Sequence, residues 1–385
     1  MPSSNQSSPT GHIFGRAPLL AAQNSIALHS FTGSQTFQPL PPATGAYPYR
    51  LDLASVIGAD PVNAIVEAGS MTFHVMGDTG GVAQPAPQQI VAQKLDADLQ
   101  QPGFLYLLGD CIYYNGELSE YPQQFYEPYA HYPAPIFAVP GNHDGDPLPG
   151  ASSLDGFLAN FCTTGPQVPS QGQSTGRTTM TQPNVYWTLA APFVTIIGLY
   201  TNVPQGGQLD DTQVAWLQTE LTAAAQDRAV ILTMHHPPVS SDSFHGGSAY
   251  LFNLLDETLA QSARAPDLVL AGHVHNYQRF TRTLSHDGGD WQIPYIVAGS
   301  GGYWHLHTMA PDAKAATLPW VLPGHEDVQL DAWVDDRHGY LRVTATPAQI
   351  SATFFTVPRP QEPWSGAPAV ADSFTVDRVT HSVSP

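Results

Sequence analysis

The sequence predicts an α/β fold with a layered and largely parallel core, on three observations. Short apolar stretches typical of buried strands alternate with segments in which apolar residues recur at helical spacing. Hydrophobic residues make up 42% of the 385 residues, which suffices for a substantial core. Polar residues gather where the apolar stretches end, and open α/β sheets hold their ligands at those ends.

Five apolar stretches are predicted as strands, and a polar cluster follows each of them. In chain order they are MTFHVM at 71–76, FLYLLG at 104–109, PIFAV at 135–139, AVILTM at 229–234 and DLVLA at 267–271. Helices are predicted from apolar spacing at 88–99, 121–130, 210–227 and 248–262. Asp211 is the expected N-cap of the third helix. A β-hairpin is expected over 339–357.

The domain organisation is predicted from shifts in composition. Residues 1–65 are rich in Ser, Gln, Pro, Gly and Ala, and are interpreted as an N-terminal arm or a small β subdomain. One large domain is expected over 66–360, with an irregular insertion at about 305–335 that is rich in Pro, His and Asp. The remaining residues, 361–385, are expected to form a C-terminal tail.

The charge balance limits the classes of partner. The chain has 13 Lys and Arg against 32 Asp and Glu, and only two of its residues are lysines, which gives a formal net charge of −19. Nucleic acids and anionic membranes require basic patches, so neither is expected as a partner. An anionic substrate would have to meet positive charge from another source, and bound metal ions are often the largest local charges in a site. The sequence does not indicate an oligomeric state.

The cysteine count, the apolar runs and the N-terminal residues bear on disulfide bonding and on cellular location. Two cysteines, Cys111 and Cys162, are too few for a disulfide framework. No apolar run reaches the roughly 18 residues of a transmembrane helix. The first 20 residues lack a basic segment followed by a continuous apolar one, so no signal peptide is predicted and a cytoplasmic location is expected. A chain trimmed of a leader would instead be secreted or periplasmic.

Candidate metal ligands follow all five predicted strands. A single such Asp is as readily a helix cap, and a single His is more often a core residue, but five clusters at equivalent positions favour one shared site. Carboxylate, amide and imidazole ligands suit Fe, Zn or Mn, and a central carboxylate can bridge two ions about 4 Å apart. The candidates are Asp78, Asp110, Asn142, His235, His273 and His275.

The order of these clusters resembles a known family. GDTG at 77–80, GDCIY at 109–113, GNHD at 141–144, TMHHP at 233–237 and GHVH at 272–275 are similar to the five blocks of the calcineurin-like metallophosphoesterases. Within that superfamily they resemble the purple acid phosphatases. Gly80 stands where most of the superfamily has a histidine, and Tyr113 stands where the purple enzymes place a tyrosinate ligand. The resemblance covers roughly residues 70–300 and implies a four-layer α/β/β/α sandwich of two mixed sheets.

The resemblance also implies roles for the ligands. Asp78, Tyr113 and His275 would bind a ferric ion, and Asp110 would bridge to a second, divalent ion of Fe, Zn or Mn. That second ion would be completed by Asn142, His235 and His273. A phenolate has an unperturbed pKa near about 10, so a trivalent ion is the better partner for Tyr113 at acid pH.

The implied activity is hydrolysis of phosphate monoesters of small molecules by in-line attack of a metal-bound hydroxide. His143 is the first candidate to protonate the leaving alcohol, with Asp144 to orient it, and His245 is the second. Packing roles are expected for His236 and for His305 with His307, and Cys111 is interpreted as a small buried hydrophobe. His74 and Tyr114 are likewise interpreted as structural and packing residues.

Three other functions stay open on the sequence. The same two-metal site would serve a phosphodiesterase, or a centre recruited to a different reaction. A non-catalytic scaffold that keeps the fold is the third, and the seven intact ligand positions count against it.

Overall fold

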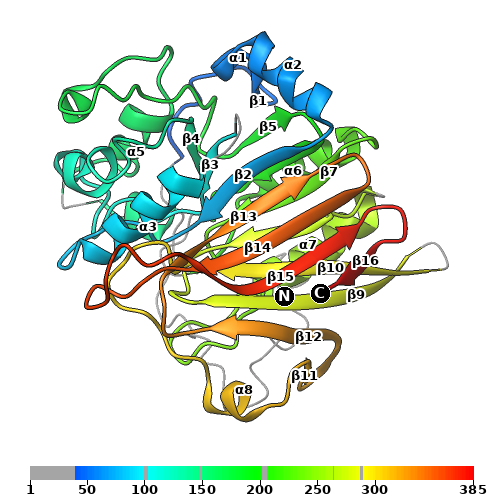
Figure 1. Ribbon diagram of the computed structural model, residues 1–385. Coiled ribbons are helices and arrows are strands. Elements are labelled where there is room, and N and C mark those ends of the chain that lie inside the picture. Colours follow the sequence, from blue (N-terminus) through cyan, green and yellow to red (C-terminus); the bar gives the residue numbers. More distant parts are fainter. Residues whose placement is uncertain (1–39, 99–102, 148–149, 202–205, 263, 287–288) are drawn as a thin grey trace, which may run out of the picture.

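The described residues form two mixed β-sheets that pack face to face (Figure 1). The structure is a computed structural model of the chain, and it describes residues 40–385 except 99–102, 148–149, 202–205, 263 and 287–288. Tyr277 of one sheet stacks on Phe354 of the other, with ring centroids 3.9 Å apart. The α/β sandwich of two mixed sheets expected from the sequence is therefore confirmed.

The nine-stranded sheet has the order β1-β5-β6-β7-β8-β10-β9-β12-β11. Strands β6, β7, β8 and β10 run parallel to one another, and the edge formed by β9, β11 and β12 is antiparallel. The strands are β1 (Arg50–Asp52), β5 (Trp187–Ala191), β6 (Val194–Gly198), β7 (Ala229–Met234), β8 (Leu268–Ala271), β9 (Tyr277–His286), β10 (Gly289–Ala298), β11 (Trp320–Leu322) and β12 (His325–Val334).

The seven-stranded sheet has the order β16-β15-β14-β13-β2-β3-β4. Strands β2, β3 and β4 are parallel, and β13 joins them to an antiparallel half. The strands are β2 (Met71–Met76), β3 (Leu105–Leu107), β4 (Ile136–Ala138), β13 (Gly339–Ala345), β14 (Gln349–Thr356), β15 (Ala369–Asp377) and β16 (Ser382–Ser384).

Helices connect the strands and flank the sheets (Figure 1). In Figure 1, α6 and α7 lie behind the nine-stranded sheet, and α3 lies beside the seven-stranded one. The helices are α1 (Ala54–Ile57), α2 (Ala59–Ala68), α3 (Ala86–Asp98), α4 (Asn142–Gly145), α5 (Asp155–Phe161), α6 (Asp211–Ala223), α7 (Ala249–Ser262) and α8 (Pro311–Ala315), with the short 3₁₀-helices η1 (Leu118–Glu120) and η3 (Ser170–Gly172) and the short π-helix η2 (Pro122–Tyr126).

All five predicted core strands and the hairpin of β13 and β14 are present. One detail of helix α6 is a correction. Its N-cap is Asp210, whose carboxylate accepts a hydrogen bond of 2.7 Å from the backbone N–H of Gln213, whereas Asp211 is the first helical residue. Both aspartates suit an N-cap by residue type. The structure assigns the cap to Asp210 because its backbone is extended, as the backbone of an N-cap residue is. The helix predicted within 121–130 is present as the short π-helix η2, over Pro122–Tyr126.

The predicted boundary segments carry more regular structure than their composition indicates. Of the N-terminal segment, residues 1–39 lie outside the described part, and β1 within 40–65 adds a parallel strand to the nine-stranded sheet. The segment 305–335 contains β12, which pairs with β9 along an antiparallel edge. The residues 361–385 contain β15 and β16, which extend the seven-stranded sheet.

A single apolar core fills the space between the sheets and under the helices. Trp187, Trp216 and Phe73 are among its largest fully buried side chains, and burial of a large apolar side chain contributes about 1.5–3 kcal/mol. Cys111 and Cys162 are both buried free thiols. Within the described ranges, no helix combines the length and apolar character needed to cross a lipid bilayer.

The assignment of Asp210 as the N-cap of α6 can be tested by mutation. We expect Asp210→Ala to lower the free energy of unfolding by about 1 kcal/mol, because the N–H of Gln213 loses its acceptor. Asp210→Asn keeps a side-chain acceptor, so this variant should change the free energy of unfolding by only a few tenths of a kcal/mol. Urea denaturation of both variants and of Asp211→Ala measures this, and a larger effect at Asp211 would contradict the assignment of the cap.

Candidate metal centre

The carboxyl ends of five strands from both sheets meet at one place. Strands β2, β3 and β4 of the seven-stranded sheet lead to Asp78, Asp110 and Asn142. Strands β7 and β8 of the nine-stranded sheet lead to His235 and to the pair His273 and His275. Hydrogen bonds between these turns, such as that from the N–H of His273 to Asp78 Oδ2 at 2.7 Å, hold the two sheets in register at the site.

Three predicted ligands form a first cluster of donor atoms. Tyr113 Oη lies 3.3 Å from Asp78 Oδ1 and 3.2 Å from His275 Nε2. The same His275 Nε2 lies 3.4 Å from Asp78 Oδ1, so the three atoms form a nearly equilateral triangle. Tyr113 and Asp78 are buried, and His275 is 7% exposed.

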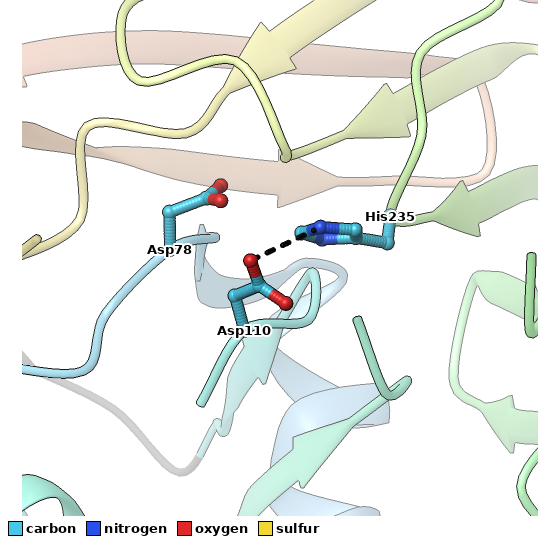
Figure 2. A group of neighbouring side chains, drawn as sticks. All are labelled: Asp78, Asp110 and His235. Atoms are coloured by element: carbon cyan, nitrogen blue, oxygen red, sulfur yellow. Dashed lines mark ion pairs between the residues drawn. The ribbon is translucent and has the colours of Figure 1, made fainter. Parts of the chain in front are cut away.

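A second cluster lies beside the first and is joined to it by Asp110. His235 Nε2 lies 2.9 Å from Asn142 Oδ1, and His273 Nδ1 lies 3.0 Å from the same oxygen and 3.2 Å from His235 Nε2. Asp110 Oδ2 is 3.4 Å from His235 Nε2. Figure 2 shows Asp110 between Asp78 and His235, and one ligand atom from each of these residues lies within 4.8 Å of the others.

The orientation of the imidazoles fits a bound cation. His235 Nδ1 lies 2.8 Å from the carbonyl oxygen of Leu108, and His275 Nδ1 lies 2.9 Å from that of His305. Because a carbonyl oxygen only accepts, each Nδ1 carries a proton, so the lone pair of Nε2 faces the site whenever the ring is neutral. In that state the Nε2 lone pairs face carboxylate oxygens, and a metal ion that bound Tyr113 as a phenolate would replace the proton that Tyr113 Oη donates to Asp78 Oδ1.

The electrostatics of the buried carboxylates show the same demand for positive charge. Burial raises the pKa of Asp78 to about 7. Burial by itself would lower the pKa of the His235 ring, yet the carboxylates of Asp110 and Asp78 outweigh it and raise that pKa to about 9. Burial raises the pKa of Tyr113 well above 10, and the two carboxylates raise it further. A tyrosinate therefore requires a strongly polarising cation here.

Three of the turns that carry candidate ligands contain a strained backbone residue. Asp78, Asp110 and His273 have φ values of 57°, 51° and 67°, in the left-handed region that residues with a Cβ seldom adopt. Such conformations cost about 1–3 kcal/mol each and persist where the surroundings fix them. Three of the seven ligands are thus held in place by backbone that a relaxed chain would avoid.

The structure gives a physical reason for the pairing of Gly80 with Tyr113. A Cβ added at Gly80 would lie 2.7 Å from Cδ2 of Tyr113 and 2.5 Å from Oε1 of Gln124. Only a glycine at 80 therefore leaves room for this tyrosine. Gln124 of η2 also exchanges two hydrogen bonds with the backbone of Tyr113, at 2.9 and 2.7 Å. The sequence pattern did not single out Gln124, because its contact depends on how η2 folds over the site.

Asp144 and His143 follow Asn142 on the short helix α4. The Asp144 carboxylate is buried and accepts hydrogen bonds from the backbone N–H groups of Gly141, Cys111 and Ile112 at 2.9–3.1 Å. The ring of His143 is oriented instead by the carbonyl oxygen of Tyr114, 2.8 Å from its Nδ1. Asp144 therefore ties the turn after β4 to the turn after β3, rather than contacting the ring as the sequence predicts.

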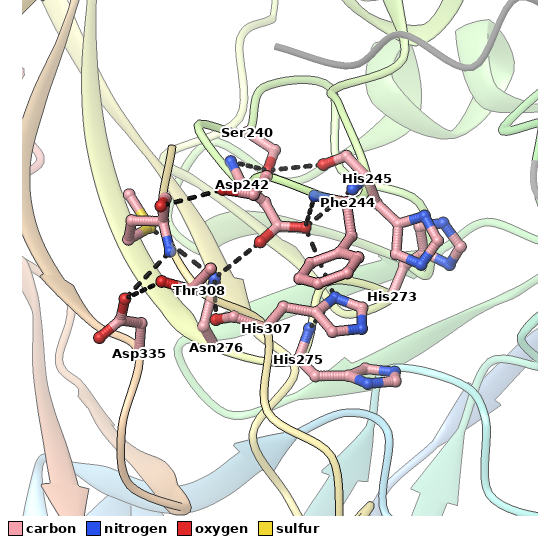
Figure 3. Close-up of polar contacts among 12 residues, drawn as sticks. Ser240, Asp242, Phe244, His245, His273, His275, Asn276, His307, Thr308 and Asp335 are labelled. Atoms are coloured by element: carbon pink, nitrogen blue, oxygen red, sulfur yellow. Dashed lines mark hydrogen bonds and ion pairs between the residues drawn. The ribbon is translucent and has the colours of Figure 1, made fainter. Parts of the chain in front are cut away.

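His245 lies at the second cluster, and a buried carboxylate holds it there. Its ring centroid is 4.5 Å from that of His273. Asp242, which is fully buried, accepts hydrogen bonds from the N–H groups of Phe244 and His245 at 2.9 and 2.8 Å (Figure 3). His307 completes this group, because its Nδ1 lies 3.5 Å from Asp242 Oδ2 and its ring stacks at 4.1 Å on that of His275.

The remaining residues considered from the sequence have other surroundings. His236 is buried, with Nδ1 2.6 Å from Thr201 Oγ1 and its ring 4.3 Å from that of His273. His74 is held by Tyr132 and Asp98 within the core. His307 is more than loop packing, because it contacts a metal-ligand candidate, and Asp242 carries no motif signal that would have found it.

The fold and the two joined clusters place a buried group of candidate metal ligands between two mixed sheets. The sequence pattern of the calcineurin-like phosphoesterases matches residues 71–277, more than half of the chain, and the chain belongs to this family. Membership implies a centre of two metal ions, which agrees with the donor atoms described above.

Relatives place the chain near two kinds of phosphoesterase. "Purple acid phosphatase 23" of Arabidopsis thaliana is 28% identical over 174 residues, which cover 44% of this chain and 34% of that protein. "Probable cyclic nucleotide phosphodiesterase" of Rhodococcus erythropolis is 36% identical over 113 residues, or 28% of this chain and 34% of that protein. In both comparisons the matched part is about a third of the relative's length.

A solved structure supports the fold. The purple acid phosphatase PPD1 from yellow lupin seeds superposes with a TM-score of 0.54 at 16% identity, covering 80% of this chain and 54% of that one. This likeness concerns the fold alone.

The contact between Gly80 and Tyr113 gives a test of the first cluster. We expect Gly80→Ala to weaken metal binding at least tenfold, because the new Cβ displaces the Tyr113 ring. The same substitution in a Tyr113→Ala background should cost markedly less, since the ring is gone. Calorimetric metal titration measures both, with Gly165→Ala as control because nothing lies within 4 Å of its added Cβ. Equal losses in both backgrounds would contradict the steric argument.

The role of Asp144 is tested by stability. We expect Asp144→Ala to lower the free energy of unfolding by about 3 kcal/mol or more, because three buried N–H groups lose their acceptor. The exposed Asp146→Ala serves as the control and should change it by about 0.5 kcal/mol or less. A loss of activity with unchanged stability and metal content would instead assign the Asp144 carboxylate to the His143 ring.

Proposed function

We propose that the protein is a phosphoric ester hydrolase that uses two metal ions and acts on phosphate monoesters of small molecules, in the manner of purple acid phosphatases. The observation that carries this proposal is the pair of three-donor clusters joined by Asp110. The family membership and the relatives named as acid phosphatases support it.

The two clusters differ in the ions that they suit. Asp78, Tyr113 and His275 would hold a ferric ion, since the buried phenol ionises only against a strongly polarising cation. Asn142, His235 and His273 offer an amide and two imidazoles, which suit divalent Fe, Zn or Mn. When bound, the two ions would neutralise the phosphate charge and lower the pKa of a water molecule that serves as nucleophile.

The chain supplies groups that move or hold protons on either side of this centre. His143 lies against the first cluster, with its ring centroid 4.6 Å from that of Tyr113, and the carbonyl oxygen of Tyr114 fixes its Nδ1 as the donor. Its Nε2 is then the atom that would exchange a proton with the leaving alcohol. His245 lies against the second cluster and is the second candidate for that role or for binding a phosphoryl oxygen.

A visible spectrum tests the proposed ferric site. We expect the oxidised, iron-loaded protein to show a tyrosinate-to-iron charge-transfer band, seen as a purple colour. Tyr113→Phe should abolish the band, whereas Tyr114→Phe should leave it, because Tyr114 is outside the ligand clusters. Asp110→Ala should lose both ions in metal analysis. A colourless but active protein that contains only divalent ions would reject the Fe(III)–Tyr113 assignment and leave the broader hydrolase proposal standing.

A phosphodiesterase on the same site is the second candidate, favoured by the 36% identity to the relative from Rhodococcus erythropolis. Phenyl phosphate and its bis-phenyl ester distinguish a monoesterase from a phosphodiesterase. Both substrates release phenol from the same kind of P–O bond, so a difference in rate reflects the number of ester groups. We expect a higher kcat/KM for the monoester. The reverse order would favour the phosphodiesterase.

A further inference from the structure

We infer that the metal centre takes phosphate esters whose organic group is a planar aromatic system, either an aryl ring or a nucleobase. This inference rests on the proposed hydrolase function and specifies its substrate class. It is carried by a row of aromatic side chains that borders the two ligand clusters.

Five rings form this row, which we call the aromatic rim. Neighbouring ring centroids are 6.5 Å apart from Tyr114 to Tyr303, 6.1 Å from Tyr303 to Trp304, 5.2 Å from Trp304 to His305 and 6.0 Å from His305 to Phe244. The rim is thus continuous although its members come from three separate segments of the chain. Aromatic side chains at such separations present both ring faces and ring edges to a planar ligand.

Rings at both ends of the aromatic rim contact the metal-ligand candidates or residues packed against them. The Tyr303 ring stacks at 4.2 Å on that of Tyr113 and lies 4.6 Å from that of His275. At the other end, the Phe244 ring is 4.9 Å from that of His307, which stacks on His275 (Figure 3). The ester group of a phosphate held by the clusters would therefore lie next to these rings.

Three members of the rim expose large apolar surfaces. Tyr114 is 46% exposed, Phe244 is 44% exposed and Trp304 is 37% exposed. Scattered exposed hydrophobic residues are ordinary on protein surfaces. Three from separate segments that border one polar site form the kind of apolar lining that ligand sites have.

Hydrogen bonds fix the rim to the same turns that carry the ligands. The N–H of Tyr303 donates to the carbonyl oxygen of Asp78 at 2.8 Å, and the carbonyl oxygen of His305 orients His275. The N–H of Phe244 is held by Asp242. The backbone that carries Tyr303, His305 and Phe244 is therefore held in place by the site, which reduces the entropy lost when a ligand binds there.

The charge distribution argues against the main alternative, a substrate that carries several phosphates. The segments that form the clusters and the rim contain no Lys or Arg: 76–81, 109–116, 141–146, 233–245, 271–277 and 299–309. The next basic residue after the rim, Lys314, is paired with Asp335 at 2.6 Å. A second or third phosphate would meet no cationic side chain from these segments, whereas an uncharged aromatic group would meet the rim.

Adenosine 5′-monophosphate and ribose 5-phosphate provide the first test, because they release the same primary alcohol position and differ by the base. We expect kcat/KM to be at least tenfold higher for the nucleotide. Trp304→Ala and Phe244→Ala should each reduce this preference by about tenfold, the usual effect of removing a base-stacking ring. Trp364→Ala is the matched control, because this tryptophan is 38% exposed and lies outside the rim, and it should keep the preference.

Binding of phosphonates tests the rim independently of catalysis, because their C–P bond is not an ester. Calorimetry with metal-loaded protein should show at least fivefold tighter binding of benzylphosphonate than of cyclohexylmethylphosphonate, and Trp304→Ala or Phe244→Ala should remove the difference. Preference in this arm alone assigns an aryl group, and preference in the nucleotide arm alone assigns a nucleobase. Equal values in both arms overturn the inference while hydrolysis upholds the proposed function. Selective phosphonate binding without hydrolysis of any ester upholds the rim and rejects the function.

Discussion

The arrangement of the whole site depends on one electrostatic constraint, the burial of two carboxylates side by side. Asp78 and Asp110 are at most 1% exposed, and no Lys or Arg occurs in the turns that carry the ligands. Charged groups are buried only where an opposite charge or a metal compensates the loss of hydration. The imidazoles and the phenol around the two carboxylates are groups that can bind a metal ion, and such an ion would supply the missing positive charge. The raised pKa of His235, to about 9, expresses the same field.

The sandwich provides the geometry that this constraint requires. Parallel strands of both sheets point their carboxyl ends to one seam, so each ligand sits on a short turn at the end of a buried strand. The turns are strained at Asp78, Asp110 and His273, and this cost is offset by hydrogen bonds between turns, such as that from His273 N–H to Asp78 Oδ2. A rigid seam thus fixes ligand positions that local sequence preferences alone would not hold.

Much of the site was predictable because its ligands directly follow strands that the apolar pattern reveals. The strands, helix α6 and the grouping of the seven candidate ligands follow from such local signals. What the sequence did not reveal depends on contacts between distant segments. Asp242 and Gln124 have ordinary neighbours in the sequence, and their roles arise only when the turn after β7 and η2 fold over the ligands. The regular structure of 305–335 was missed for a related reason, since β12 lies between β9 and the edge strand β11, and its residues are mostly half-buried and its composition is polar.

The aromatic rim and the metal ligands are two parts of one construction, and this links substrate choice to metal geometry. His305 belongs to the rim by its ring and orients His275 by its carbonyl oxygen, and Tyr303 is anchored on the backbone of Asp78. A shift of the 303–305 turn would therefore move both the rings proposed to contact the ester group and the side chains proposed to bind the metal ions. If the proposed function holds, two different groups share the recognition of the substrate in this chain with few basic residues: the metal ions would neutralise its charge, and the rings would contact its organic group.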